Sequence, residues 1–145
     1  MAQILVPIDG HGPKMQRALA EAIRIHRRED VPVYLLSVQP PVNGHVASYF
    51  QPSELERLQH DAGAEELAPA QSLLEAAGVR YRTVVRVGRR AETIARTAQE
   101  LGCDRIVMDA PVASGLSGGD RWFGSLAQQV NHILAGVRGC QVIGA

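Results

Sequence analysis

Apolar runs and amphipathic stretches alternate along the chain, and this alternation predicts its elements. Short apolar runs predict strands, because strands that are buried on both faces of a parallel sheet carry apolar side chains at successive positions. One of the runs alternates with polar residues instead, which is also typical of a strand. We expect strands at residues 3–8, 31–38, 80–87, 105–108 and 141–143.

The stretch after the first strand has the spacing of an amphipathic helix. Gly12 and Pro13 indicate its start, because proline suits the first position of a helix. The side chains expected on its buried face recur at intervals of three and four residues: Met15, Ala18, Leu19, Ala22, Ile23 and His26. We expect His26 to be a partly buried structural histidine.

Three further helices are expected. Ser53 and Glu56 have the spacing of a capping box, which predicts a helix that opens there and ends near Gly78, a suitable residue after a helix terminus. A third helix is expected over residues 89–101. The stripe of the fourth helix is expected to consist of Phe123, Leu126, Ala127, Val130, Ile133 and Leu134. The stretch between residues 39 and 51 is expected to be irregular.

Strands that alternate with helices indicate an α/β fold, in which a parallel sheet is covered by helices on both faces. We expect a single domain over residues 1–145. Ligands in such sheets bind beyond the carboxyl ends of the strands, where the winding reverses. Residues 9–13 and 109–125 are therefore expected to face the binding crevice.

Composition narrows the possible functions. Lys and Arg together number 15 and Asp and Glu also 15, so the net charge is zero. Such a balance gives no electrostatic basis for binding nucleic acid or an anionic membrane. No apolar run approaches the roughly 20 residues of a membrane span, and no signal peptide is expected. The two cysteines show no metal-ligand spacing. A cytoplasmic protein with reduced thiols is expected.

The glycine-rich segment at residues 110–125 is the most informative chemical feature. Glycines allow close approach of the backbone, and successive N–H groups can surround phosphate oxygens. Ser125 lies where the fourth helix is expected to begin, and a helix N-terminus favours an anion. The alternative interpretation, a surface loop with an ordinary helix start, is equally compatible with the composition.

Motifs of several nucleotide-binding and catalytic classes are absent. No Gly-Lys-Ser/Thr is present, which excludes a P-loop. Gly10 and Gly12 lack a third glycine at the dinucleotide-binding spacing. No Gly-x-Ser-x-Gly elbow is present, and neither cysteine has a partner that spacing identifies. We therefore do not expect an enzyme.

The chain resembles the universal stress protein family over nearly its full length. The matching segments lie in the expected order along the chain, at residues 4–10, 33–38, 87–94, 103–108, 115–118 and 124–125. The resemblance implies a three-layer α/β/α fold, similar to the adenine nucleotide alpha hydrolases, with a five-stranded parallel sheet ordered 3-2-1-4-5. It also implies a homodimer built through the last strand, at Gln141, Val142 and Ile143. In one subgroup of the family, ATP or AMP is bound without turnover.

The resemblance also implies a set of nucleotide-binding residues. Asp9 corresponds to the residue that meets the adenine–ribose end, and its alternative role is that of a helix N-cap or turn residue. Val38 corresponds to the position whose backbone reads the adenine edge, and a simple core valine is the alternative. The full set consists of Pro7, Ile8, Asp9, Val38, Met108, Asp109, Gly115, Gly118, Gly124, Ser125 and Leu126.

Two residues depart from the pattern of the nucleotide-binding subgroup. Asp109 and Val112 stand where that subgroup has glycines. A carboxylate beside a phosphate costs about 4 kcal/mol at 4 Å and an effective dielectric near 20. Asp9 and Asp109 could instead share Mg²⁺ or Mn²⁺, although we expect Asp109 to cap N–H groups of its own loop.

The sequence therefore predicts a stress-response regulator that binds ATP or AMP between the first and fourth strands. The alternative is a stress protein that binds no nucleotide and acts as a dimeric protein-interaction module, because the phosphate loop is degenerate. We expect Arg86, Arg89 and Arg90 to belong to a solvated face. A nucleotide hydrolase would need Asp9, Asp109 or Asp120 as a base and is not expected.

Overall fold

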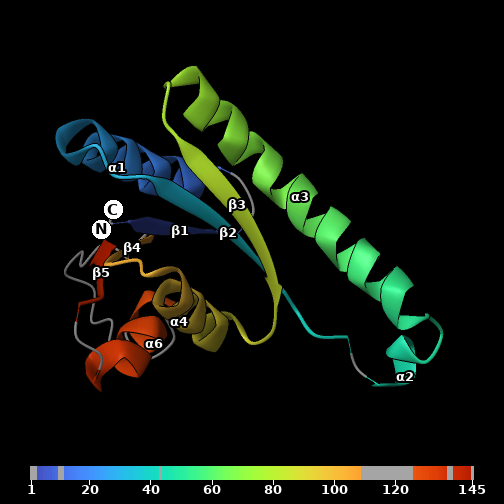
Figure 1. Ribbon diagram of the computed structural model, residues 1–145. Helices are drawn as coiled ribbons and strands as arrows, with labels where there is room; N and C mark the ends of the chain where they lie inside the picture. Colours follow the sequence, from blue (N-terminus) through green and yellow to red (C-terminus); the bar gives the residue numbers. More distant parts are fainter. Residues whose placement is uncertain (1–2, 10–11, 43, 109–125, 137–138, 145) are drawn as a thin grey trace.

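A parallel sheet forms the centre of the molecule (Figure 1). The computed structural model describes residues 3–9, 12–42, 44–108, 126–136 and 139–144. Within these ranges the strands are β1 (Ile4–Ile8), β2 (Val33–Gln39), β3 (Tyr81–Val87), β4 (Arg105–Met108) and β5 (Gln141–Gly144). All neighbouring strands pair in parallel, in the order β3-β2-β1-β4-β5. This confirms the predicted sheet.

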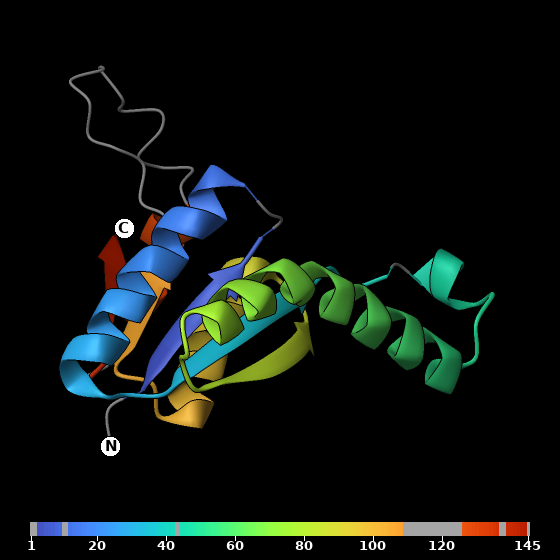
Figure 2. The same ribbon diagram turned by 90° about the horizontal axis from the view of Figure 1, so that it is seen from above.

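Helices cover both faces of the sheet, which confirms the predicted three layers (Figures 1 and 2). Helices α1 (Pro13–Glu29) and α3 (Pro52–Ala76) pack on one face, and α4 (Arg90–Leu101) and α6 (Leu126–Ile133) on the other. A short helix α2 (Gly44–Ala47) precedes α3, and a 3-10 turn η1 (Leu134–Gly136) follows α6.

The sheet is buried on both faces because successive residues of its central strands face opposite helices. In β1, Ile4 and Val6 belong to the core under α1 and α3, whereas Leu5 belongs to the core under α4 and α6. Each of these side chains is fully buried. This explains why β1 is a continuous apolar run and does not alternate.

Three details of the predicted helices are wrong. The predicted buried face of α1 omits Ile25, which is fully buried. His26 is partly buried, as predicted, and so is Ile23. His26 Nδ1 lies 2.7 Å from the carbonyl oxygen of Val31. In α6, Ile133 is exposed and does not lie on the buried stripe. The predicted capping box does not form, and α3 begins at Pro52 with no side-chain cap. Proline suits this first position, and Ser53 therefore lies inside the helix.

Helix α3 is packed along only part of its length. Its first half projects beyond the sheet and leads back to α2 (Figures 1 and 2). Leu58 in this half is exposed, as is Tyr49 before it. The first buried residue is Gly63, where an added Cβ would lie only 2.6 Å from Cγ1 of Val85 on β3. From Gly63 onward, α3 therefore lies directly on the sheet.

Candidate functional site

The carboxyl ends of the parallel strands gather the predicted site residues that the structure describes. Pro7 and Ile8 end β1, and Asp9 follows them directly. Val38 lies near the end of β2, and Met108 ends β4. Since β2 and β4 are the two parallel neighbours of β1, these residues come to one edge of the sheet. Their grouping agrees with the expected position of the crevice.

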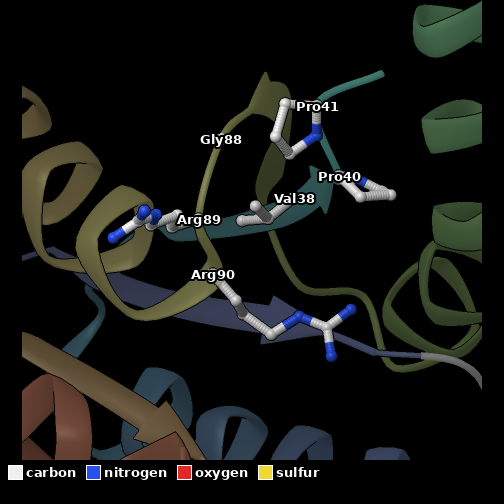
Figure 3. A pocket seen from close by; sticks show the side chains of 6 residues that line it. All are labelled: Val38, Pro40, Pro41, Gly88, Arg89 and Arg90. Carbon is white, nitrogen blue, oxygen red and sulfur yellow. The ribbon is translucent and has the colours of Figure 1, made fainter. Parts of the chain in front are cut away.

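A small cavity opens at this edge, on the face of the sheet that α4 covers (Figure 3). Its volume is about 300 Å³, at the lower end of the range for small-molecule sites. The lining residues come from the end of β2, the segment after it and the turn into α4: Val38, Pro40, Pro41, Gly88, Arg89 and Arg90. Val38 is thus both a core residue and a wall of the cavity.

Gly88 fixes the turn between β3 and α4 beside the cavity. Its φ is +156°, a conformation that other residues rarely adopt, and an added Cβ would lie 2.5 Å from Thr93 Oγ1. Its backbone N–H donates to the carbonyl of Gln39 at the end of β2, over 3.1 Å. The start of α4 is therefore held against the end of β2.

Arg90 connects this turn to the end of β1. As the first residue of α4, it donates from Nη1 to Oδ2 of Asp9 over 2.7 Å. The side chains of Arg90 and Asp9 are 41% and 62% exposed. Arg90 is exposed, as the sequence predicts, but its pairing with Asp9 was not predicted. No sequence spacing indicated this pair, because 81 residues separate its members.

Arg89 behaves as the sequence predicts. Its side chain is 84% exposed, and its Nη1 lies 3.9 Å from Oε1 of Glu92 in the first turn of α4. Figure 3 shows the guanidinium groups of Arg89 and Arg90 pointing to different sides of the cavity. Only Arg90 extends toward the end of β1 (Figure 3).

The alternative interpretation of Asp9 as a helix cap is wrong. The N-cap of α1 is Gly12. Within the described part of the chain, the carboxylate of Asp9 pairs with Arg90. This leaves Asp9 as a carboxylate at the ligand-facing edge rather than a structural cap.

Several predicted site residues lie outside the described residues. These are the aspartate, the glycines and the serine of the glycine-rich segment: Asp109, Gly115, Gly118, Gly124 and Ser125. Their roles, and a cation shared by Asp9 and Asp109, stay predictions. Among the described residues, no three His, Cys, Asp or Glu side chains form a metal-binding group. Leu126, the last predicted residue, begins α6 and packs partly buried against the α4-side core.

The thiol of Cys103 is unsuited to nucleophilic chemistry in the folded chain. Burial raises the pKa of Cys103 to about 12, and the neighbouring Cys140 contributes to the increase. At neutral pH this thiol is protonated, and the thiol is a much weaker nucleophile than the thiolate. Burial raises the pKa of Cys140 as well.

The last strand lies at an edge of the sheet. Within the described residues, β5 pairs with β4 alone, and Val142 and Ile143 are partly buried. An edge strand of this kind offers unpaired backbone groups to another chain. The predicted dimer contact through Gln141, Val142 and Ile143 stays a prediction. Among the helices that the structure describes, none has the length and apolar character to cross a membrane.

Comparisons with known proteins agree with this architecture. The model of the universal stress protein family matches residues 1–133. A universal stress protein structure from Archaeoglobus fulgidus is 23% identical with a TM-score of 0.70, and the match covers 99% of this chain and 98% of that chain. The structure from the same organism in complex with dAMP is 23% identical, covers 99% and 97% of the two chains, and has a TM-score of 0.68.

A plant protein gives a similar match. A universal stress protein family member from Arabidopsis thaliana with AMP bound is 14% identical, with a TM-score of 0.61 and coverage of 99% of this chain and 90% of that chain. At these identities the structures show a common fold. No curated protein sequence matches the chain.

Proposed function

The chain belongs to the universal stress protein family, and we propose that it binds an adenine nucleotide, ATP or AMP, in the crevice at the carboxyl edge of its sheet. In this proposal it acts as a cytoplasmic stress-response regulator, without catalytic turnover. It holds the nucleotide between the ends of β1 and β4, with the base in the cavity beside Val38.

The cavity at the ends of β2 and β3 is the observation that carries this proposal. One side of it is apolar, formed by Val38, Pro40 and Pro41. The flat apolar face of a purine suits such a wall. The other side carries Arg90, which pairs with Asp9. The carboxylate supplies an acceptor for ribose hydroxyls, and the guanidinium balances its charge.

Structures with the same fold support the choice of ligand. The Archaeoglobus fulgidus protein is in complex with dAMP, and the Arabidopsis thaliana protein has AMP bound. Both ligands are adenine monophosphates. In this chain the additional phosphates of ATP would extend toward the glycine-rich segment, where Asp109 stands in the sequence. We therefore expect AMP to bind at least as well as ATP unless Mg²⁺ accompanies ATP.

The test combines extraction of bound nucleotide with calorimetry. Protein purified without added nucleotide is denatured, and its supernatant is analysed for AMP and ATP. Isothermal titration then measures AMP and ATP binding, with and without Mg²⁺. Val38→Phe fills the cavity from its wall and should abolish binding, whereas Leu58→Phe, on the exposed half of α3, should not. Circular dichroism checks that both variants fold.

Three results would each contradict a part of the proposal. An empty supernatant together with no heat from either nucleotide would favour the alternative, a dimeric interaction module that binds no nucleotide. Release of ADP on prolonged incubation with ATP would contradict the absence of turnover. Both the proposal and its alternative include a homodimer that forms through β5. Light scattering that gives the mass of one chain, 15.7 kDa, would contradict the dimer.

A further inference from the structure

The ion pair of Arg90 and Asp9 places a cation and an anion together at the mouth of the cavity. Arg90 lines the cavity, and Asp9 follows the central strand β1 beside it. The distance from Nη1 to Oδ2 is 2.7 Å. A ligand that enters the cavity and reaches the end of β1 therefore meets both charges.

Asp9 alone would disfavour a phosphorylated ligand. An uncompensated carboxylate repels phosphate oxygens, and this repulsion grows as the ligand excludes water from the site. The guanidinium of Arg90 cancels that charge at hydrogen-bond distance.

We propose that Arg90 is a specificity-determining residue, which makes the crevice prefer phosphorylated nucleosides to nucleosides by neutralising Asp9. The inference rests on the proposed function, since it concerns the same crevice. It adds the residue that sets the preference and the physical reason for it. Adenosine carries no phosphate, and its affinity does not depend on this compensation.

The exposure of the pair suits a role in specificity rather than in folding. Arg90 and Asp9 are both partly exposed, and solvent-exposed ion pairs contribute little to folding stability. A variant without the pair should therefore fold and can be titrated. Arg89 is a poorer candidate, because it is far more exposed and lies near Glu92 in the first turn of α4.

The chain offers a matched control at the other edge of the sheet. Arg80 donates from Nη2 to Oδ1 of Asp30 over 3.0 Å, and both side chains are exposed. Asp30 follows the end of α1, and Arg80 precedes β3, so this pair lies at the amino edge, away from the cavity. Arg80→Gln removes the same charge as Arg90→Gln without touching the crevice.

The experiment measures the affinities of AMP and adenosine by isothermal titration at low ionic strength. In Arg90→Gln, the preference for AMP over adenosine should fall about three- to fivefold, the size expected for a partly screened charge pair. Arg90→Lys keeps the charge and should retain most of the preference. Arg80→Gln should change it by less than about twofold. An unchanged ratio in Arg90→Gln would overturn the inference.

A double-mutant cycle with Asp9→Asn tests the mechanism. If Arg90 acts by neutralising Asp9, replacing Arg90 in a chain that already carries Asp9→Asn should change the ratio much less. An undiminished effect would overturn neutralisation and indicate direct contact between Arg90 and the phosphate. If Asp9→Asn binds neither ligand, Arg90→Lys decides, because equal loss in the Arg90→Lys and Arg90→Gln variants would also overturn the inference.

The outcomes separate this inference from the proposed function. Wild-type protein that binds neither AMP nor adenosine would contradict the proposed function itself. Wild-type protein that binds AMP, with the same ratio in Arg90→Gln, would contradict only the role of Arg90.

Discussion

Arginine–carboxylate bridges lie at both ends of the parallel strands, and the most buried bridge at the amino ends differs in geometry and burial from the bridge at the carboxyl ends. At the amino edge, Arg105 of β4 donates two hydrogen bonds to Glu29, the last residue of α1, over 2.7 and 2.9 Å. The Arg105 side chain is only 11% exposed. At the carboxyl edge, Arg90 donates one hydrogen bond to the more exposed Asp9.

The difference indicates that the bridge at the amino edge stabilises the fold, whereas the bridge at the carboxyl edge leaves room for a ligand. A two-bonded, largely buried guanidinium fixes the end of α1 against the start of β4. Asp104 strengthens the same edge, because its Oδ1 accepts from the backbone N–H of Gln3 over 3.2 Å. At the carboxyl edge, the single exposed bridge lies beside a cavity and can be rearranged at little cost.

The largest effect is expected from removing the buried arginine. Arg105→Ala should lower the free energy of unfolding by about 1–3 kcal/mol, because two charge-assisted hydrogen bonds and a buried side-chain stem are lost. Urea denaturation followed by circular dichroism measures this change. If the free energy of unfolding falls by less than about 0.5 kcal/mol, as for ordinary surface substitutions, the bridge of Arg105 does not stabilise the fold more than the bridge of Arg90 does.

The pH dependence of stability sharpens the comparison. The hydrogen bonds from Arg105 hold the pKa of Glu29 below its ordinary value of 4.5, and the charge of Arg105 adds to this effect. The unfolded chain therefore binds a proton at Glu29 before the folded chain does. The bridge should stabilise the fold fully above pH 4.5 and lose this contribution as the pH falls further.

Glu29→Gln provides the measurement. The free energy of unfolding of the wild type should exceed that of the variant at pH 7, and the difference should shrink below pH 4.5. Denaturant titrations at pH 7, 5, 4 and 3 follow this difference. A difference that stays constant over these pH values would show that the charge of Glu29 does not stabilise the fold.

The smallest effect on stability is expected at the carboxyl edge. Arg90→Gln should change the free energy of unfolding by less than about 1 kcal/mol, since exposed ion pairs contribute little. The same urea titration measures it beside Arg105→Ala. Equal losses in the two variants would mean that the bridge beside the cavity also holds the fold together.

The strands could be predicted because most of them are short apolar runs between amphipathic stretches, whereas their order was implied by the resemblance to the universal stress protein family. Burial on both faces leaves β1 without a polar residue and β2 with few, and this constraint is visible in the sequence. The short helix α2 was not predicted, because Asn43 and Gly44 favour a turn. The start of α3 was misplaced because Pro52 begins the helix before the apparent capping box.

Individual residues of the candidate site could be predicted from the sequence, but the contact between Asp9 and Arg90 could not. Val38 and Met108 were identified through the family resemblance, and Asp9 through the resemblance together with its position after a central strand. The partner of Asp9 was missed, since Arg90 stands among other arginines and nothing local distinguishes it. The predictions for the glycine-rich segment concern residues outside the described ranges.

At Gly63, helix α3 makes its first close contact with β3. The helix rests there on Val85 without an intervening Cβ, and about 17 Å of it extends from that point to Pro52. A methyl group at position 63 would require Val85 or the helix to shift, and any tilt of the helix would move its N-terminal end further than the contact itself. The direction of the projecting first half of α3 therefore depends on the absence of a side chain at Gly63.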